Sequence, residues 1–245
     1  MGDDLTARTI ELTGHAGDTI EAYVSNPSTD ARRGGVVVIH HMPGYDSATK
    51  EIVRHFAVLG YDAICPNLHY RDAPGSAPDD AAAANRANGG VPDDRLAGDV
   101  AAATDYLRAL PGSNGKVGTI GYCSGGRQSV LAGCRVDVDA VVDCYGAFVT
   151  GTPPPERPIK NLVPELPNLR APLLGLFGND DAHPSMAEVD ELEQILTDLG
   201  KPFEIHRYEG AGHAFFSVNR PAYRVEAALD GWDRITEFYS RYLEA

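Results

Sequence analysis

Two patterns of hydrophobic and polar residues follow one another along the chain. Apolar and polar residues alternate in "ARTIELT" (7–13) and "DTIEAYVS" (18–25), which is typical of two half-buried strands joined as a hairpin. Six later segments are continuously apolar instead, at 34–41, 61–66, 116–123, 138–146, 171–178 and 202–210. Continuous apolarity indicates burial on both faces, as in parallel strands covered by helices.

Helical periodicity fills most of the intervals between these apolar segments. It predicts helices at 47–59, 93–109, 124–134, 185–199 and 222–243. Ser185 followed by Glu188 is a capping box, which marks the start of the fourth helix. The alternation predicts an α/β fold with a mostly parallel central sheet flanked by helices and an antiparallel N-terminal edge. We expect residues 1–245 to form a single domain of this kind.

Two long segments interrupt the alternation, at 66–92 and 146–170. Both are rich in Pro, Gly and Ala, and both leave the predicted sheet at the carboxyl ends of its strands. Ligands of open α/β sheets bind at that edge, and long loops in compact domains are often functional. The two segments are therefore predicted to form walls of a pocket.

Charge and cysteine usage narrow the function further. The formal net charge of −14 argues against a nucleic-acid partner, because phosphate binding needs clustered Lys and Arg. The four cysteines have neither a CxxC pair nor a Cys/His ligand spacing, so we expect no metal and no cofactor. The N-terminus lacks the features of a secretion signal, and no apolar run is long enough to span a membrane. A cytoplasmic protein without a membrane partner is expected, of undetermined oligomeric state.

The segment "KVGTIGYCSGG" (116–126) carries the strongest chemical signal. A nucleophile on a tight strand-to-helix turn needs small neighbours at the spacing G-x-nucleophile-x-G, and Gly121, Cys123 and Gly125 satisfy it. A serine nucleophile at Ser124 would place Tyr122 where the first glycine is needed. The start of the following helix also favours a thiolate, in contrast to an inert buried cysteine. Cys123 is therefore the candidate nucleophile.

Partners for this nucleophile follow the next strands in the expected order of acid and then histidine. "LLGLFGNDDAHPS" places Asp180 and Asp181 just after an apolar strand, and "HRYEGAGHAFF" places His213 in a glycine turn after the last strand. His213 is the candidate base. Asp180 is preferred as the acid, and in that case Asp181 would cap the next helix. Asp181 is the alternative acid.

Three motifs together resemble the dienelactone hydrolase family of α/β-hydrolases: "SNGKVGTIGYCSGG", "GYDAICPNLHYRDAPG" and "YEGAGHAFF". The likeness runs over most of the chain, and cysteine in the nucleophile position is distinctive of that family. The resemblance implies the α/β-hydrolase fold and a triad of Cys123, Asp180 and His213. It also implies an oxyanion hole formed by the backbone N–H groups of Met42 and Ser124, and a substrate carboxylate bound by Arg86.

The sequence departs from the family pattern at two positions. His41 stands where the family has a glutamate, and it can accept or orient a proton without being a fixed anion. Ser217 stands where the family has a second substrate arginine, with Arg220 close by in sequence. We expect His41 to contribute to the substrate site.

Cysteine as the nucleophile restricts the substrate. A thiolate is itself a good leaving group, so the acyl transfer proceeds only if the other group leaves as easily, as an enolate or a thiolate does. The predicted function is hydrolysis of a small lactone or activated ester through a thioester acyl-enzyme. A thioesterase or broad carboxylesterase is the alternative, followed by an α/β-hydrolase fold that binds a ligand without turnover.

Overall fold

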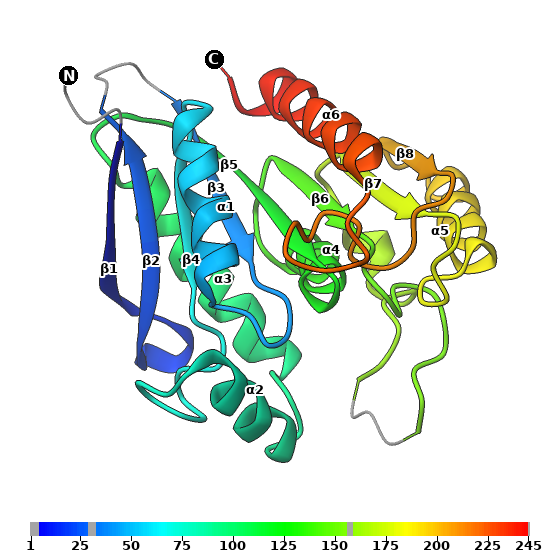
Figure 1. The fold of residues 1–245 in the computed structure, drawn as a ribbon. Coiled ribbons are helices and arrows are strands. Elements are labelled where there is room, and N and C mark those ends of the chain that lie inside the picture. Colours follow the sequence, from blue (N-terminus) through cyan, green and yellow to red (C-terminus); the bar gives the residue numbers. More distant parts are fainter. Residues whose placement is uncertain (1–4, 29–32, 156–158, 245) are drawn as a thin grey trace.

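The computed structural model describes residues 5–28, 33–155 and 159–244. The described residues form one sheet of eight strands in the order β1-β2-β4-β3-β5-β6-β7-β8 (Figure 1). The strands are β1 (Leu5–Thr13), β2 (Thr19–Pro27), β3 (Arg33–Ile39), β4 (Asp62–Pro66), β5 (Ser113–Tyr122), β6 (Ala140–Cys144), β7 (Leu173–Gly178) and β8 (Phe203–Tyr208). β1 pairs antiparallel with β2 and β2 with β4, and the other pairs are parallel. The predicted mostly parallel sheet with an antiparallel N-terminal edge is confirmed.

Six α-helices accompany the sheet in the described part of the chain. They are α1 (Ser47–Val58), α2 (Pro78–Ala87), α3 (Asp93–Arg108), α4 (Ser124–Arg135), α5 (Met186–Asp198) and α6 (Val225–Leu243). The five predicted helices are all present, with ends shifted by at most three residues. The capping box at Ser185 is confirmed, since its hydroxyl accepts from the Glu188 N–H and the Glu188 carboxylate accepts from the Ser185 N–H at 2.6 Å.

α2 lies inside the segment 66–92, which the sequence predicts as a loop. Its start is favoured by Pro78 at the first helical position and by acidic residues in the first turn. The buried residues of α2 are Ala81, Ala82 and Asn85, so its inner face is built from small and polar side chains. Such a face gives no strong apolar periodicity, which explains why the pattern does not reveal this helix.

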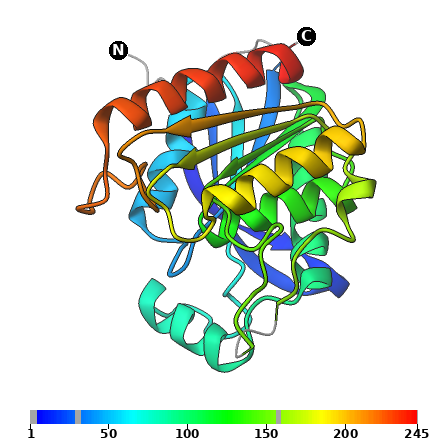
Figure 2. The same cartoon turned by 90° about the vertical axis from the view of Figure 1, so that its right-hand side faces the viewer.

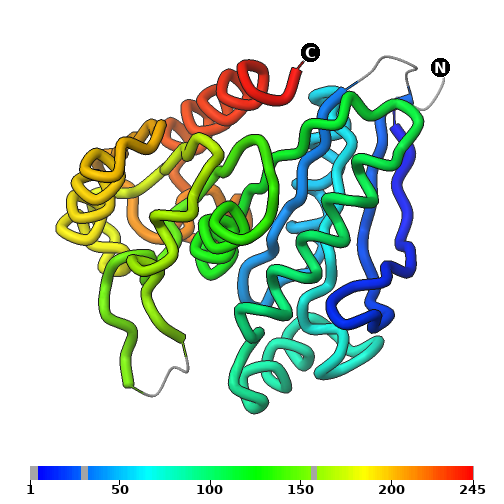
Figure 3. The backbone as a smooth tube through the Cα atoms, turned by 180° about the vertical axis from the view of Figure 1, so that it is seen from behind, coloured from blue at the N-terminus to red at the C-terminus, as the bar shows by residue number. Residues whose placement is uncertain are grey.

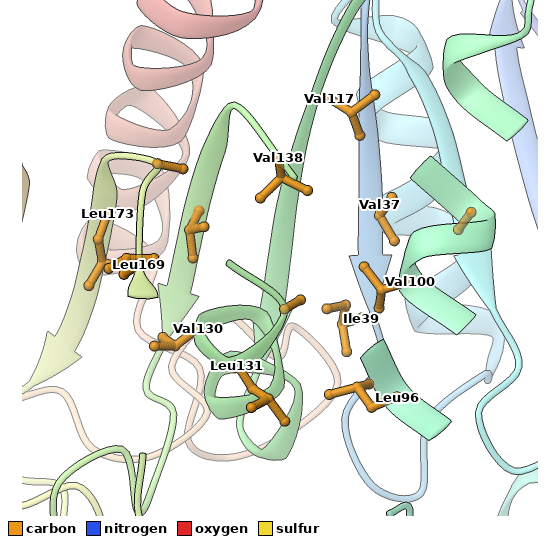
Figure 4. Packing of buried hydrophobic residues seen from close by; sticks show 14 of the residues in the cluster. Val37, Ile39, Leu96, Val100, Val117, Val130, Leu131, Val138, Leu169 and Leu173 are labelled. Atoms are coloured by element: carbon orange, nitrogen blue, oxygen red, sulfur yellow. The ribbon is translucent and has the colours of Figure 1, made fainter. Parts of the chain in front are cut away.

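The helices cover both faces of the sheet. α1 and α6 lie on one face, and α3, α4 and α5 lie on the other, as seen from opposite sides in Figures 1 and 3 and edge-on in Figure 2. Residues of β3 alternate between the layers: Val36 and Val38 pack toward α1 and α6, and Val37 and Ile39 pack toward α3 and α4 (Figure 4). Burial on both faces accounts for the continuous apolar runs of the sequence.

The carboxyl ends of the parallel strands meet at one edge of the sheet. In Figure 1 the arrowheads of β3 and β6 point toward this edge, where α2 lies, and the two termini lie at the opposite edge. Loops that follow β3, β5, β7 and β8 therefore meet at the carboxyl edge and carry the candidate site. No helix among the described residues is both long enough and apolar enough to cross a bilayer.

Candidate active site

Cys123 lies on the tight turn between β5 and α4. Its backbone φ is +57°, a left-handed value that costs a residue with a Cβ on the order of 1–3 kcal/mol. The turn is fixed on one side by the hydrogen bond from the Cys123 N–H to the Cys144 carbonyl (3.0 Å) and on the other by the bond from the Gly126 N–H to the Cys123 carbonyl (3.0 Å). The half-buried thiol thus lies at the start of α4, as the G-x-C-x-G spacing predicts.

Gly121 and Gly125 are required by close backbone approach. A Cβ on Gly121 would collide with the Gly125 carbonyl, and a Cβ on Gly125 would collide with the Ile39 carbonyl of β3. The two glycines therefore let α4 pack directly on the strands β5 and β3. This contact brings the first turn of α4 against the carboxyl end of β3, where the loop with His41 and Met42 begins.

His213 connects Cys123 to a carboxylate. Its Nδ1 lies 2.7 Å from Oδ2 of Asp181, and the Cys123 thiol is the second side chain that interacts with the ring. The Asp181 side chain is only 3% exposed, and its Oδ1 accepts the His183 N–H at 2.9 Å. Because both carboxylate oxygens are engaged, Asp181 holds the imidazole with Nδ1 as the donor and the other ring nitrogen toward the sulfur.

The partner of His213 is Asp181 and not Asp180, which corrects the preference drawn from the sequence. Asn179 and Asp180 form the centre of a turn closed by the Asp181 N–H to the Gly178 carbonyl (3.2 Å). The Asp180 N–H binds the Ala211 carbonyl (2.9 Å), and its side chain is exposed. Because Asn179 and Asp180 form the turn after β7, Asp181 is the next residue, and its side chain points to His213.

The surroundings of His213 favour its charged form. Burial lowers the pKa of His213, but the hydrogen bonds to Asp181 and Cys123 outweigh burial and raise it to about 10. At neutral pH the ring is therefore an imidazolium.

The predicted oxyanion hole consists of the backbone N–H groups of Ser124, which follows Cys123 in the chain, and Met42. Ser124 is the first residue of α4, so its N–H is one of those an α-helix leaves without an intrahelical acceptor. Met42 lines the same pocket as Cys123. The segment before Met42 is held by His40, whose Nδ1 donates to the His41 carbonyl (2.9 Å) and whose Nε2 accepts the Leu68 N–H (3.1 Å).

A pocket of about 300 Å³ opens from Cys123 and His213. Its walls come from the β3–α1 loop, α1, the segment 214–220 and Trp232 of α6. No described residue of 66–92 or 146–170 lines this pocket, so the prediction that these segments wall the site is not met here. The sequence places both segments at the correct edge, but the pocket extends toward the face covered by α1 and α6.

The predicted substrate-binding residues divide between the pocket and the surface. His41 lines the pocket, and its Nε2 lies 3.5 Å from Oδ2 of Asp46. Burial lowers the pKa of His41, and the positive charge of Arg220 acts in the same direction. The Asp46 carboxylate acts in the opposite direction. Arg220 and Ser217 also line the pocket, whereas Arg86 lies exposed in the last turn of α2 and is not among the lining residues.

Aromatic residues of the pocket were not singled out from the sequence. The Tyr145 ring lies 5.2 Å from the His213 ring, and Phe216 and Trp232 extend the aromatic wall away from it. Tyr145 ends an apolar strand run and Trp232 lies within an amphipathic helix, where aromatic residues ordinarily serve packing. Only their positions in the sequence indicated that they could line the pocket: Tyr145 follows the carboxyl end of β6, and Phe216 follows His213 by three residues.

Comparison with known proteins bears on this geometry. The family model "Dienelactone hydrolase family" matches residues 20–243. The chain belongs to this family. Carboxymethylenebutenolidase of Pseudomonas putida is 30% identical over 94% of this chain and 94% of that protein. The crystal structure of a "Putative Dienelactone Hydrolase" from Klebsiella pneumoniae superposes with a TM-score of 0.87 at 26% identity, covering 98% of this chain and all of that one.

Membership of the dienelactone hydrolase family confirms the resemblance seen in the motifs. It also confirms the α/β-hydrolase fold and the prediction of a dienelactone hydrolase-like carboxylic ester hydrolase. Among the described residues no group of three or more His, Cys, Asp or Glu side chains is arranged to hold a metal ion.

Proposed function

We propose that this protein hydrolyses lactones or activated carboxylic esters through a thioester formed on Cys123. One observation carries the proposal: His213 at the end of β8 interacts with the Cys123 sulfur at the end of β5 and is hydrogen-bonded to Asp181, which is buried behind it at the end of β7. This is the geometry of a nucleophile, its proton carrier and the group that orients the carrier.

The first half of the reaction forms the thioester. The Cys123 sulfur attacks the carbonyl carbon, and the carbonyl oxygen takes up the displaced electron pair between the N–H groups of Ser124 and Met42. The bond to the leaving oxygen then breaks. The His213 imidazolium gives its proton to that oxygen, which departs as an alcohol, an enol or, from a lactone, as the other end of the opened ring.

The second half returns the enzyme to its starting state. His213, now neutral, accepts a proton from water while the water oxygen attacks the thioester carbon. The carbon–sulfur bond breaks, the acid is released, and the thiolate is again paired with the imidazolium. Throughout the cycle Asp181 keeps the proton-bearing Nδ1 toward itself, so the other ring nitrogen faces the reacting atoms.

A thioesterase or broad carboxylesterase activity is the second candidate, and one observation favours it. Arg86 is exposed on α2 and outside the pocket, and Ser217 occupies the position of the second family arginine. Arg220 is then the one arginine among the described lining residues. A pocket with a single arginine does not clamp a compact dicarboxylate from two sides, so a wider range of acyl groups fits the same chemistry.

The test compares a dienelactone with a short p-nitrophenyl ester, using the wild type and Cys123→Ala. We expect both substrates to lose at least about 10³-fold in kcat/KM in the variant, as removal of a nucleophile does. Preference for the lactone by about tenfold, or 1.4 kcal/mol, would support the lactonase assignment. Ester turnover without lactone turnover would favour the second candidate. Full activity of Cys123→Ala would contradict the proposed mechanism.

A further inference from the structure

The pocket has two chemically different ends. Cys123, His213, His41 and Arg220 form one end, which holds the reacting groups and the arginine. The other end is lined by apolar and aromatic side chains from α1, the segment after β8 and α6. We call it the aromatic end and define it by Ile52, His55, Phe216 and Trp232.

A continuous series of ring contacts leads from the catalytic histidine to the aromatic end. The Tyr145 ring lies 5.2 Å from His213 and 6.2 Å from Phe216. Phe216 lies 6.0 Å from Trp232 at an interplanar angle of 85°, and Trp232 lies 4.5 Å from His55. The wall between the reacting thiol and the aromatic end is therefore aromatic along its length.

Backbone packing fixes the floor of the aromatic end. Gly231 of α6 is buried, and a Cβ there would collide with the Phe216 ring. The tip of the Phe216 ring thus approaches the helix backbone, and Phe216 is 9% exposed, while the Trp232 side chain beside it remains half-buried. A half-buried indole against a fixed phenyl ring leaves an aromatic surface free for a further ring or chain to cover.

One carboxylate lines the pocket near His55, that of Glu51, and it is 69% exposed and paired with Arg54. Burial lowers the pKa of His55, although the Glu51 carboxylate acts in the opposite direction. The His55 ring is therefore neutral at pH 7 and adds to the apolar wall. Arg220, by contrast, makes no side-chain hydrogen bond or ion pair with a described residue and lies toward the reacting groups. The pocket therefore separates an apolar group from a polar or anionic one.

The apolar surface continues beyond the pocket. Val218, which lines the mouth, is 72% exposed. Val225 and Leu229 precede Trp232 by seven and three residues on one face of α6, and they are 50% and 59% exposed. Three large apolar side chains are thus exposed beyond the aromatic end, so a chain longer than the pocket would still meet apolar contacts.

We propose that the aromatic end is a subsite for an aryl or alkyl group, so that the preferred substrates are activated esters or lactones bearing such a group rather than compact ones. This inference rests on the proposed function for the site of bond cleavage and adds the class of substrate. The aryl or alkyl group belongs either to the acyl part or to the alcohol part of the ester. In both cases it packs against Trp232.

The kinetic test uses two pairs of substrates. Trifluoroethyl acetate and trifluoroethyl 3-phenylpropanoate vary the acyl side, and trifluoroethyl acetate and phenyl acetate vary the alcohol side. For each pair we take the ratio of kcat/KM for the bulky ester to kcat/KM for the small ester. Comparing this ratio between the wild type and Trp232→Ala cancels the difference in intrinsic reactivity between the two esters. We expect the ratio to fall by about tenfold in one pair, the scale of a lost apolar contact in a pocket.

Two further variants sharpen this result. Ile52→Trp fills the aromatic end and should also lower the ratio. Tyr242→Ala removes a half-buried aromatic residue of the same helix outside the pocket, and should leave the ratio within about twofold of the wild type. The inference is overturned if Trp232→Ala and Ile52→Trp leave the ratio unchanged in both substrate pairs.

A binding measurement separates this inference from the proposed function. Trp232 is the only tryptophan of the chain, so its fluorescence reports on the aromatic end alone. In Cys123→Ala, 4-phenylbutan-2-one should shift the emission to shorter wavelength and protect it from acrylamide, and acetone should not. That shift without Cys123-dependent hydrolysis would sink the proposed function alone. Cys123-dependent hydrolysis with no shift at saturating ketone would sink the subsite.

Discussion

Two histidine centres lie at the same edge of the sheet and behave in opposite ways. His213 follows β8, is hydrogen-bonded to a carboxylate and interacts with a thiol, and its pKa is raised to about 10. His40 and His69 follow β3 and β4, and their rings meet edge-on at 4.7 Å. Burial is the main cause that lowers the pKa of His40 to about 3 and that of His69 to about 4.

The partners decide the difference, since all three rings are at least partly buried. His213 has Asp181 on one side and Cys123 on the other, so each proton it carries is stabilised by an acceptor. His40 donates to one backbone carbonyl and accepts one backbone N–H, a pattern that suits only the neutral ring. The first centre is built to carry a proton, and the second is built to hold the loops after β3 and β4 together.

The same substitution at both centres gives the largest expected contrast. His213→Gln removes the proton carrier, and we expect kcat/KM for an activated ester to fall by about 10⁴-fold or more. His69→Gln keeps a side-chain amide donor and touches no reacting atom, so its kcat/KM should stay within about tenfold of the wild type. Steady-state kinetics on both purified variants measures the contrast. Equal losses would mean that the two centres do not differ in the way described.

A second pair of variants tests which carboxylate serves His213. Asp181→Asn replaces the buried carboxylate by an amide that also offers a donor, which disturbs the imidazole tautomer, so kcat/KM should fall by about 10³-fold. Asp180→Asn changes an exposed side chain one residue away and should leave activity within about twofold. The reverse order of effects would restore the preference drawn from the sequence and refute the assignment of Asp181.

A smaller effect is expected on stability in acid. His69 binds a proton more weakly in the folded than in the unfolded chain, so stability falls as the pH drops from about 6.5 toward 4. Between pH 7.5 and 5, the wild type should lose about 2 kcal/mol more than His69→Gln in urea unfolding. Equal losses in the two proteins would show that His69 does not titrate as described.

The sign at His213 is the opposite. Its pKa is raised on folding, so its contribution to stability is present below about pH 6.5 and is lost as the pH rises through 10. His213→Gln should therefore flatten the stability curve on the alkaline side and leave the acid side unchanged. The side chain is 35% exposed, and solvent screening keeps this effect small.

The sequence predicted those parts of the molecule that depend on patterns of burial. Strands buried on both faces give continuous apolar runs, and α1, α3, α4, α5 and α6 give periodic ones, so all were found near their observed ends. The turn at Cys123 was also predictable, because its two glycines answer a backbone contact that only glycine permits. α2 escaped because its buried face consists of alanines and an asparagine.

The site was predictable only as far as chain order fixes it. His213 and an aspartate after β7 followed from the order of the strands, but the choice between Asp180 and Asp181 depends on a turn of two residues. The walls of the pocket depend on how α1 and α6 pack beside the sheet. No local pattern encodes that packing, so the structure was needed to assign Trp232 and Arg220 to the pocket.

The central claim is that Cys123 carries the acyl group during turnover. Rapid acid quenching of the enzyme with p-nitrophenyl acetate, followed by peptide mass spectrometry, measures this directly. We expect one acetyl group on the peptide that contains Cys123, released by neutral hydroxylamine as a thioester is, and absent from Cys123→Ala. Turnover with no acyl group on that peptide, or with the group on Ser124, would contradict the account.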